Sequence, residues 1–326
     1  SSYFITINSQ NLKKALDTAQ NSSSTPTILS PIPILAVISK KVLLVDDNQI
    51  NLKNIENFNI GDINSKTRWS DALNKVDYII HCAARTHIMN EVEKEELTKY
   101  RQVNVEGTIN LAKQAAAKGV KRLIFLSSIK VNGDKTIGSS SFKYNDIVHP
   151  KDPYAISKLE AEQALREISK DTELEIVIIR APLVYGKGVK GNLSRLIKLI
   201  KYGLPLPLGL IQNQRSMIGV DNLIDLISCC IENPDAAGKT FLASDGKDLS
   251  TPDLINHIAS SMKRIVRLFP FPIFLLKFFG KIFGKKKEIN RLVGSLKIDS
   301  SYTQKVLNWK PPVSVEEGIK RMVQDS

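Results

Sequence analysis

The chain has 326 residues, of which 46 are lysine or arginine and 33 are aspartate or glutamate, so its formal net charge is +13. Its 42% hydrophobic and 24% charged residues are typical of a globular protein with a full core in one large domain or two. The positive charge suits anionic ligands such as nucleotides and nucleotide sugars, or an anionic membrane surface. The basic residues are dispersed and no nucleic-acid-binding motif occurs, so we expect no nucleic-acid partner.

The cysteines, the N-terminus and the histidines indicate a cytoplasmic protein without a metal. Cys82, Cys229 and Cys230 are too few for a disulfide framework, so we interpret them as buried small residues in a reducing compartment. Residues 1–6 lack the charged start and apolar core of a signal peptide. No apolar run approaches the ~20 residues that cross a bilayer. His81, like the other histidines, has no partners at metal-ligand spacing, so we expect no metal.

Strands and helices alternate along most of the chain. Apolar runs predict strands at Tyr3–Ile7, Ile34–Ile38, Ile55–Ile63, Val76–Cys82, Leu123–Leu126, Glu175–Arg180 and Thr240–Ala243. Helical spacing predicts helices at Asn11–Gln20, Trp69–Leu73, Lys94–Lys118, Tyr154–Ser169, Leu193–Tyr202 and Asp221–Glu232, and another with Thr251 as its N-cap. Such alternation implies right-handed crossovers, so we predict an α/β fold with a parallel, doubly wound sheet.

The residues best suited to chemistry lie around the strand Leu123–Leu126, which leads to Ser128. A later helix begins near Tyr154 and carries Lys158 four residues further on, so these two side chains share one helix face. Ser128 lies at the carboxyl end of its strand, where ligands bind in sheets of this kind. The lysine would favour the phenolate and lower the pKa of Tyr154, so that the phenol could exchange a proton near neutral pH. We therefore predict a proton-transfer site.

A wider set of motifs surrounds these residues. It comprises Gly61-Asp62-Ile63, His81-Cys82-Ala83-Ala84, Val103-Asn104-Val105-Glu106-Gly107-Thr108, Ser127-Ser128, Tyr154-x-x-x-Lys158, Arg180-x-Pro182-x-Val184-Tyr185-Gly186, Arg215 to Leu223 and Leu307-Asn308-Trp309-Lys310-Pro311. An ordinary helix start could also carry a tyrosine and a lysine, but of the eight tyrosines only Tyr154 has a lysine four residues later. From about Asn59 to its C-terminus the chain resembles the extended short-chain dehydrogenase/reductase family, whose members are nucleotide-sugar epimerases, dehydratases and 4-keto reductases.

The resemblance implies a role for each matching residue. Tyr154 would be the acid/base, Lys158 would bind the nicotinamide ribose and tune Tyr154, and Ser128 would hydrogen-bond the sugar. The remaining implied contacts are Asp62 and Ile63 by the adenine, Ala83, Ala84 and Pro182 along the cofactor, Asn104 in support of the active-site backbone, and Asn192 and Arg215 on the substrate. A bidentate guanidinium suits the nucleotide diphosphate that Arg215 would hold.

The resemblance also implies an activity, a domain division and an assembly. Residues 1–184, with 216–246 returning to them, would form a Rossmann-type dinucleotide-binding domain, and 185–215 with 247–326 a smaller C-terminal α+β substrate domain. The enzyme would transfer hydride at C4 of a UDP-sugar with NAD or NADP, as a 4-epimerase or a 4-keto reductase. The phrases at 127–133 and 182–192 resemble a bacterial branch that acts on UDP-N-acetylhexosamines for surface polysaccharide. Family members commonly form homodimers, here through the helices near Glu95–Lys118 and Tyr154–Ser169.

The N-terminus departs from the family pattern. There the first strand runs into three glycines that let the backbone approach the cofactor's pyrophosphate. Aligned with Tyr3–Ile7 as the first strand, Ile7, Gln10 and Lys13 take the glycine positions, and no glycine precedes Gly61. Lys13 could pair with a phosphate in part compensation. The alternative function is a non-catalytic nucleotide-sugar or protein-binding relic with a disabled cofactor loop.

The segment 264–287 is basic and aromatic, and no acidic residue occurs from Leu254 through Lys287. Two interpretations fit this pattern. The segment could form a helix pair that buries its aromatic side chains and turns its lysines outward. It could instead lie on an anionic membrane as a peripheral contact.

Overall fold

The computed structural model describes residues 42–45, 62–86 and 93–324. The predictions for Tyr3–Ile7, Asn11–Gln20 and Ile34–Ile38, and the positions Ile7, Gln10 and Lys13, lie outside these ranges. Of the strand predicted at Ile55–Ile63, only Asp62 and Ile63 are described, and neither is in a strand.

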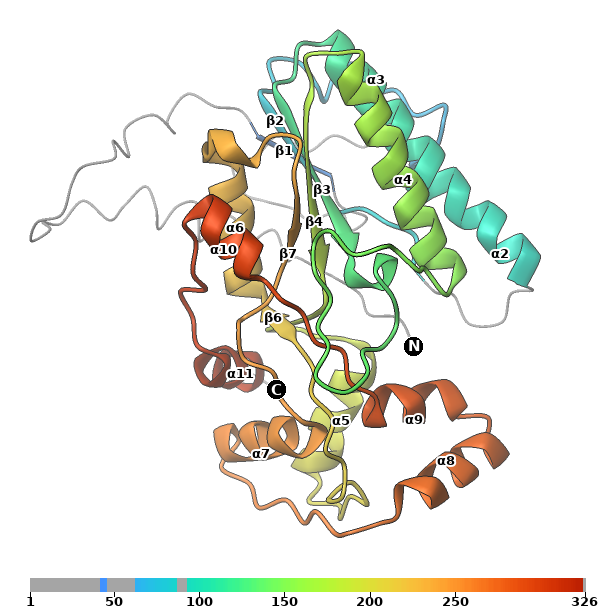
Figure 1. The fold of residues 1–326 in the computed structure, drawn as a ribbon, viewed down its shortest axis with the longest axis vertical. Helices are drawn as coiled ribbons and strands as arrows, with labels where there is room; N and C mark the ends of the chain where they lie inside the picture. Colours follow the sequence, from blue (N-terminus) through green and yellow to red (C-terminus); the bar gives the residue numbers. More distant parts are fainter. Residues whose placement is uncertain (1–41, 46–61, 87–92, 325–326) are drawn as a thin grey trace, which may run out of the picture.

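A five-stranded parallel sheet forms the centre of the molecule (Figure 1). Its strands, in spatial order, are β1 (Val42–Val45), β2 (Tyr78–His81), β3 (Arg122–Ser128), β4 (Glu175–Ala181) and β7 (Thr240–Leu242). All residues of β2 and β3, and all but the first of β4, are buried, which explains their nearly unbroken apolar runs. The predicted Rossmann-type parallel sheet is confirmed, but strand β1 was not foreseen from the sequence.

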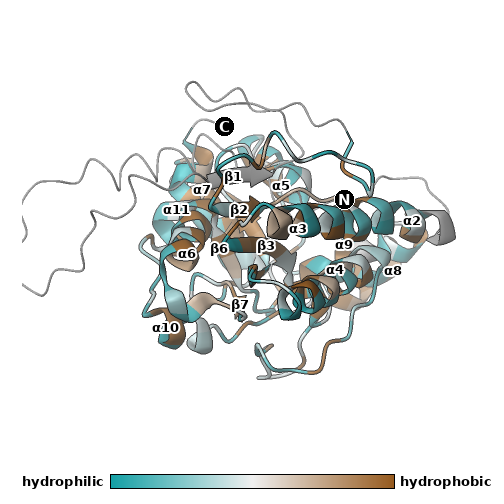
Figure 2. Ribbon diagram, turned by 90° about the horizontal axis from the view of Figure 1, so that it is seen from above, coloured by the Kyte–Doolittle hydropathy of each residue, from teal (hydrophilic) through white to brown (hydrophobic). Residues whose placement is uncertain are grey.

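Helices cover both faces of the sheet, as a doubly wound fold requires (Figures 1 and 2). The helices α3 (Thr108–Ala117) and α4 (Pro153–Lys170) lie on one face, and α6 (Val220–Glu232) and α10 (Ser301–Leu307) on the other. Side chains alternate between the two sides: Leu123 packs in the core with α3 and α4, and its neighbour Ile124 in the core with α6. Two hydrophobic layers therefore sandwich the sheet.

The helix predicted at Lys94–Lys118 is present, but its middle is a π-helix. The path runs through α2 (Glu93–Tyr100), the π-helical segment η2 (Arg101–Gly107) and α3. Single π turns inside helices occur frequently at functional sites. The short helix predicted at Trp69–Leu73 is wrong: the segment forms turns, with one hydrogen bond of 2.9 Å from the Leu73 N–H to the Trp69 carbonyl.

A second group of elements packs below the carboxyl ends of the strands (Figure 1). It contains the two-stranded parallel sheet β5 (Leu183–Tyr185) and β6 (Met217–Gly219), and the helices α5 (Gly191–Lys201), α7 (Thr251–Ser261), α8 (Ile273–Ile282), α9 (Lys286–Val293) and α11 (Val315–Val323). Two short 3₁₀ turns, η3 (Ile129–Val131) and η4 (Pro234–Ala236), complete the fold. The predicted N-cap of α7 is displaced by one residue: Ser250, with Asp253, forms a capping box, and Thr251 is the first helical residue.

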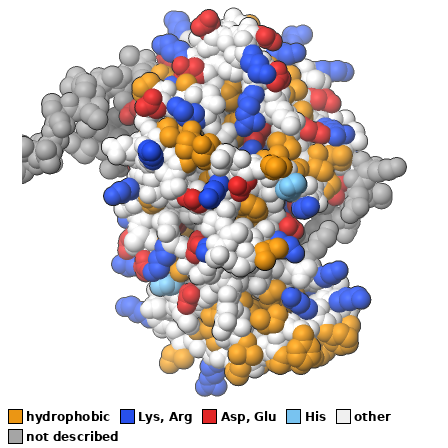
Figure 3. All heavy atoms as spheres, viewed as in Figure 1, with side chains coloured by type: hydrophobic (Ala, Val, Ile, Leu, Met, Phe, Trp, Pro, Cys, Tyr) orange, Lys and Arg blue, Asp and Glu red, His pale blue; other side chains and the backbone are white. Residues whose placement is uncertain are grey.

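The interpretation that segment 264–287 forms a helix pair with outward lysines is confirmed by α8 and α9, but the expected burial of its aromatic side chains is wrong for most of them, since only Phe271 packs on the core of the second group. Phe274, Phe278 and Phe283 are 70%, 57% and 71% exposed, and Figure 3 shows hydrophobic side chains gathered at the lower end of the molecule, where Figure 1 places α8. Among the described helices, none is both long enough and apolar enough to cross a bilayer.

Candidate active site

The site lies where β3 and β4 end and α4 begins. Ser128 is the last residue of β3 and stands in register with Ala181 of β4, which the buried Pro182 follows. Helix α4 starts beside them because the carboxylate of Asp152 caps it, accepting a hydrogen bond of 2.8 Å from the Ala155 N–H. The cap places Tyr154 in the first helical turn and Lys158 in the next.

Tyr154 is partly buried between two neighbours that the sequence did not point to. The ring of Tyr100, from α2, meets it edge-on with 6.1 Å between the centroids. The ammonium of Lys130, from η3, lies 5.9 Å from the centroid of the Tyr154 ring and 2.5 Å from the Asp152 carboxylate. Lys130 therefore ties the end of β3 to the start of α4 and brings a cation to the phenol.

Lys158 is a buried amine, only 1% exposed. Desolvation lowers the pKa of Lys158 to about 7, against the opposing field of Glu162 and Cys82. Its Nζ lies 3.8 Å from the centroid of the Phe125 ring, a cation–π contact, and no described residue accepts a hydrogen bond from it. A buried amine that needs acceptors fits the ribose hydroxyls of a nicotinamide nucleotide.

Asn104 joins three parts of the site from the π-helical turn. Its side-chain oxygen accepts a hydrogen bond of 2.8 Å from the Arg85 N–H, and its amide donates to the Arg85 carbonyl at 3.1 Å. The amide also donates to the Ser157 hydroxyl at 2.9 Å, and that hydroxyl donates to the Tyr154 carbonyl at 2.8 Å. The loop after β2, which contains the buried Ala83, is thereby held against α4.

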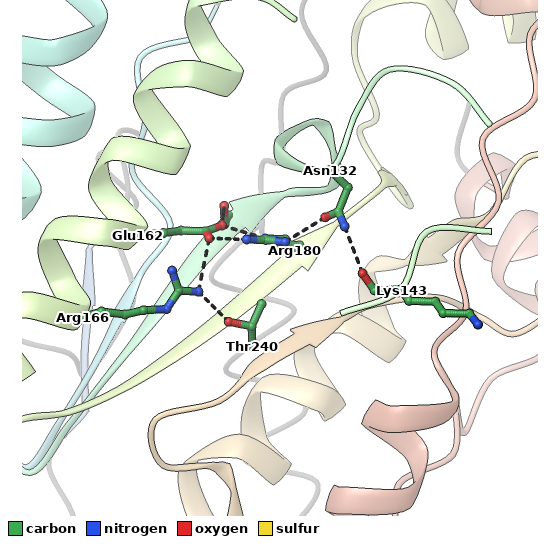
Figure 4. A network of polar contacts seen from close by, with 7 residues as sticks. Asn132, Lys143, Glu162, Arg166, Arg180 and Thr240 are labelled. Carbon is green, nitrogen blue, oxygen red and sulfur yellow. Dashed lines mark hydrogen bonds and ion pairs between the residues drawn. The ribbon is translucent and has the colours of Figure 1, made fainter. Parts of the chain in front are cut away.

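A buried ion pair lies one helical turn beyond Lys158 (Figure 4). The fully buried Glu162 accepts hydrogen bonds from the Ser127 hydroxyl at 2.5 Å and from Arg180 at 2.7 and 3.0 Å. Arg180 also donates to the side-chain oxygen of Asn132 at 3.0 Å, and Arg166 donates to Glu162 at 3.5 Å. This network connects α4, β3, β4 and the turn after η3 directly behind Ser128. Arg180 belongs to a recognisable sequence motif, but its partner Glu162 is not evident from the sequence.

The residues expected along the rest of the cofactor lie beside the sheet. Asp62 is exposed, and its carbonyl accepts a hydrogen bond of 2.7 Å from the Thr67 hydroxyl. Ile63 packs so closely on Gly107 that a Cβ at Gly107 would stand 2.6 Å from the Ile63 side chain, which explains the glycine. Ala84 is partly buried after Ala83.

Strand β1 changes the comparison with the family's glycine loop. It pairs with β2, the position that the first strand of a doubly wound nucleotide-binding sheet takes in the order 3-2-1-4-5-6. Val42–Val45 therefore holds the position that the alignment of the motifs gives to the predicted strand Tyr3–Ile7. The residues that follow this strand are Asp46 and Asp47, and Gly61 remains the first glycine of the chain.

The two expected substrate residues lie in the second group of elements. Asn192 is in the first turn of α5 and is partly buried. The Arg215 guanidinium donates to the carbonyls of Arg291 and Gly294 at 3.0 and 3.1 Å, and so reaches the carboxyl end of α9. The described contacts thus join Asn104 to the first turns of α4 through Ser157, and join the end of β3 to the same helix through Lys130 and Asp152. Asn192 and Arg215 lie in the other group of elements.

Comparisons with known proteins agree with this architecture. A family model described as the NAD dependent epimerase/dehydratase family matches residues 35–243. A UDP-glucose 4-epimerase of Vibrio cholerae is 47% identical over 268 residues, 82% of each chain. An N-acetyl-alpha-D-glucosaminyl-diphospho-ditrans,octacis-undecaprenol 4-epimerase of Escherichia coli O157:H7 is 29% identical over 283 residues, 81% of this chain and 82% of that one. The UDP-glucose 4-epimerase of Thermotoga maritima, solved with UDP-glucose, shares the fold with a TM-score of 0.67 at 18% identity, over 97% of this chain and 94% of that one.

Proposed function

This chain belongs to the NAD dependent epimerase/dehydratase family and is an NAD-dependent enzyme, and we propose that it interconverts UDP-sugars that differ in configuration at C4. The observation that carries the proposal is the buried Lys158, which has no described hydrogen-bond acceptor, lies one turn beyond Tyr154 and packs on Phe125 of the strand that carries Ser128. Family membership and this intact set of three residues argue against a non-catalytic relic.

Each of these side chains would have one task. The Tyr154 phenolate would take the proton from the C4 hydroxyl, and the phenol so formed would return it after the sugar has turned. Ser128 would hydrogen-bond the same oxygen, and Lys158 would hold the nicotinamide ribose and stabilise the phenolate. NAD, when bound, supplies the hydride acceptor for this reaction. The binding energy of the UDP group would position C4 for the transfer.

Further residues would line the cofactor and the substrate. Asp62, Ile63, Ala83, Ala84, Asn104 and Pro182 would contact or support the dinucleotide, and Asn192 and Arg215 would bind the UDP-sugar. To grip the diphosphate, the Arg215 guanidinium would exchange its present carbonyl partners on Arg291 and Gly294 for phosphate oxygens, which are stronger acceptors.

Two other activities are alternatives to this proposal. Reduction of a 4-keto sugar would use the same tyrosine and lysine but would consume NAD(P)H, and either reaction would serve surface polysaccharide synthesis. A lipid-linked sugar diphosphate is a second candidate substrate, because one relative is named for such a compound and α8 exposes an apolar face. We further propose that the enzyme is a cytoplasmic homodimer.

The decisive experiment is an epimerisation assay with UDP-glucose and UDP-N-acetylglucosamine in the presence of NAD, with the products separated by chromatography. The wild type should form the C4 epimer without net reduction of NAD. Tyr154→Phe should lose at least about a hundredfold in kcat with little change in substrate affinity, because it removes only the proton-transfer group. Tyr144→Phe, at an exposed tyrosine outside the site, is the matched control.

Three results would contradict the proposal. Full activity in Tyr154→Phe would show that another group transfers the proton. A calorimetric titration in which UDP binds but neither NAD nor NADPH binds would support the non-catalytic relic instead. Stoichiometric consumption of NADPH with a 4-keto substrate, and no epimerisation, would show that the enzyme is a 4-keto reductase and not an epimerase.

A further inference from the structure

Helix α8 turns an apolar face toward solvent. Phe274, Phe278 and Ile282 follow one another at four-residue spacing and are 70%, 57% and 60% exposed. Phe279 and Phe283 extend this face, 44% and 71% exposed, with 6.5 Å between their ring centroids. Helices on the surface of globular proteins normally present their polar side to water. Here the five side chains form a contiguous patch of the kind that marks an interaction site.

Basic side chains border this patch. Lys277 and Lys281 are exposed, one turn apart on the same helix, and neither forms an ion pair with a residue that the structure describes. The exposed bases nearby in the sequence are Lys263, Arg264, Arg267, Lys285 and Lys286, while no acidic residue occurs between positions 254 and 287. Lys285 approaches Glu288 at 3.9 Å, a loose surface pair. The surroundings of the patch are therefore strongly positive.

We propose that this α8 face, meaning the five apolar side chains with Lys277 and Lys281, docks on the anionic phospholipid surface of a membrane. Phenylalanine rings would enter the boundary between headgroups and acyl chains, and the two ammonium groups would remain at the level of the phosphates. The ten residues of α8 are too few to cross the bilayer, so the helix would lie in the interfacial plane.

A second copy of this chain is a poorer occupant of the face. Two α8 faces joined symmetrically would bring like charges together around their apolar centre, which opposes association. An anionic lipid surface instead neutralises both lysines while it covers the rings. Charge complementarity therefore favours an anionic membrane over a second copy of the chain as the partner of this face.

The first test places a fluorescent reporter in the face. Both native tryptophans, Trp69 and Trp309, are at most 5% exposed, so their emission should not respond to lipid. Phe278→Trp in the full chain should shift to the blue when vesicles of phosphatidylcholine with 30% phosphatidylglycerol (about a third anionic lipid, a strongly negative surface) are added. Ile147→Trp, at a site 80% exposed on another surface, is the matched control and should not shift.

The second test separates the two physical contributions by vesicle co-sedimentation. Lys277→Gln with Lys281→Gln should lower partitioning roughly 25-fold, because each basic residue near an anionic surface contributes about fivefold. Phe274→Ser with Phe278→Ser should lower it at least about tenfold per residue by removing the inserted rings. Lys113→Gln with Lys118→Gln, and Ile137→Ser with Ile147→Ser, remove equal charge or exposed apolar surface elsewhere and should leave partitioning unchanged.

The outcomes distinguish the membrane from other occupants of the face. Loss of binding at high salt and on pure phosphatidylcholine vesicles supports the proposal. Absence of binding by the wild type, or equal binding by all variants, overturns it. Light scattering that shows a dimer converted to a monomer by Phe274→Ser with Phe278→Ser, without vesicle binding, would overturn it in favour of a contact between copies. Epimerase activity in detergent-free solution is a separate readout, since Tyr154→Phe should abolish it and leave vesicle binding intact.

Discussion

At the scale of single residues, Lys158 shows how burial changes the chemistry of a common side chain. An amine in water has a pKa of about 10.4, but removal from water lowers the pKa of Lys158 to about 7. Such a group can change its charge near neutral pH. Its N–H groups need hydrogen-bond acceptors, and no described residue provides one. These properties support the proposal that Lys158, one turn from Tyr154 and against Phe125 of β3, binds a ligand.

This shift predicts how stability depends on pH. The unfolded chain keeps the Lys158 proton up to about pH 10.4, whereas the folded chain releases it near pH 7. Between these values the unfolded state binds more protons, so the free energy of unfolding rises with pH on account of this residue. Lys158→Met should remove that rise. Urea unfolding from pH 7 to 10 without NAD would measure it, with exposed Lys118→Met as the control. Identical pH profiles for the wild type and Lys158→Met would contradict the burial effect.

At the scale of elements, the Glu162–Arg180 pair couples the helix that carries Tyr154 to the strand that carries Ser128. Both side chains are almost completely buried, and the carboxylate also receives the Ser127 hydroxyl. A buried ion pair of this kind does more to favour one packing arrangement of the helix and the strand than to raise the free energy of unfolding. The reason is that the desolvation of both charges offsets most of their attraction. We infer that it positions the neighbouring site residues.

Breaking the pair and replacing it should therefore have different effects. Glu162→Gln leaves the Arg180 charge buried and should cost about 3–5 kcal/mol in unfolding free energy, whereas Glu162→Leu with Arg180→Met should recover most of that stability. The double variant should still lose about tenfold or more in kcat, since Ser127, the neighbour of Ser128, and Asn132 each lose a hydrogen-bond partner. Denaturant unfolding and kcat measurements decide this. Glu160→Gln, which breaks an exposed pair with Arg101, should cost less than about 1 kcal/mol. Full activity in the double variant would show that the network has only a structural role.

At the scale of the whole molecule, α2, η2, α3 and α4 form a helical layer on one side of the sheet, and α8 lies at the opposite end of the molecule (Figure 1). Leu159 and Ile156 of α4 are only partly buried in the single chain. A dimer through this layer would cover them and would leave the α8 face open to the membrane. Dimerisation and membrane contact are therefore compatible.

The dimer proposal predicts a particle of twice 36.3 kDa. Leu159→Glu should reduce it to a single chain, because the proposed dimer interface would bury this charge without a partner. Leu199→Glu, at a leucine 39% exposed on α5, should leave the mass unchanged. Light scattering with size-exclusion chromatography would measure both. A wild type that elutes as a monomer would refute the proposal directly.

Much of the site could be predicted because its signals are local. Each signal lies within a few neighbouring residues. These signals are the four-residue spacing of Tyr154 and Lys158, the strand that leads to Ser128, and the continuous apolar runs of β2 and β4. Glu162 and Arg180 were missed as a pair because they belong to different elements and are hydrogen-bonded only after those elements pack. Lys130 and Tyr100 were missed for the same reason.

The sequence by itself determined the parallel doubly wound sheet and the order of residues along α4. Burial on both faces of a strand and helical periodicity both produce hydrophobic patterns that are visible in short stretches of sequence. Only the tertiary structure decided that Val42–Val45 is the strand beside β2, since strand pairing joins segments that are distant in the chain. It also decided that the rings of α8 remain exposed. Phe274 on α8 and Phe125 in the core are the same residue type, each within an apolar stretch of the sequence, and only the packing of other elements determines which of them is covered.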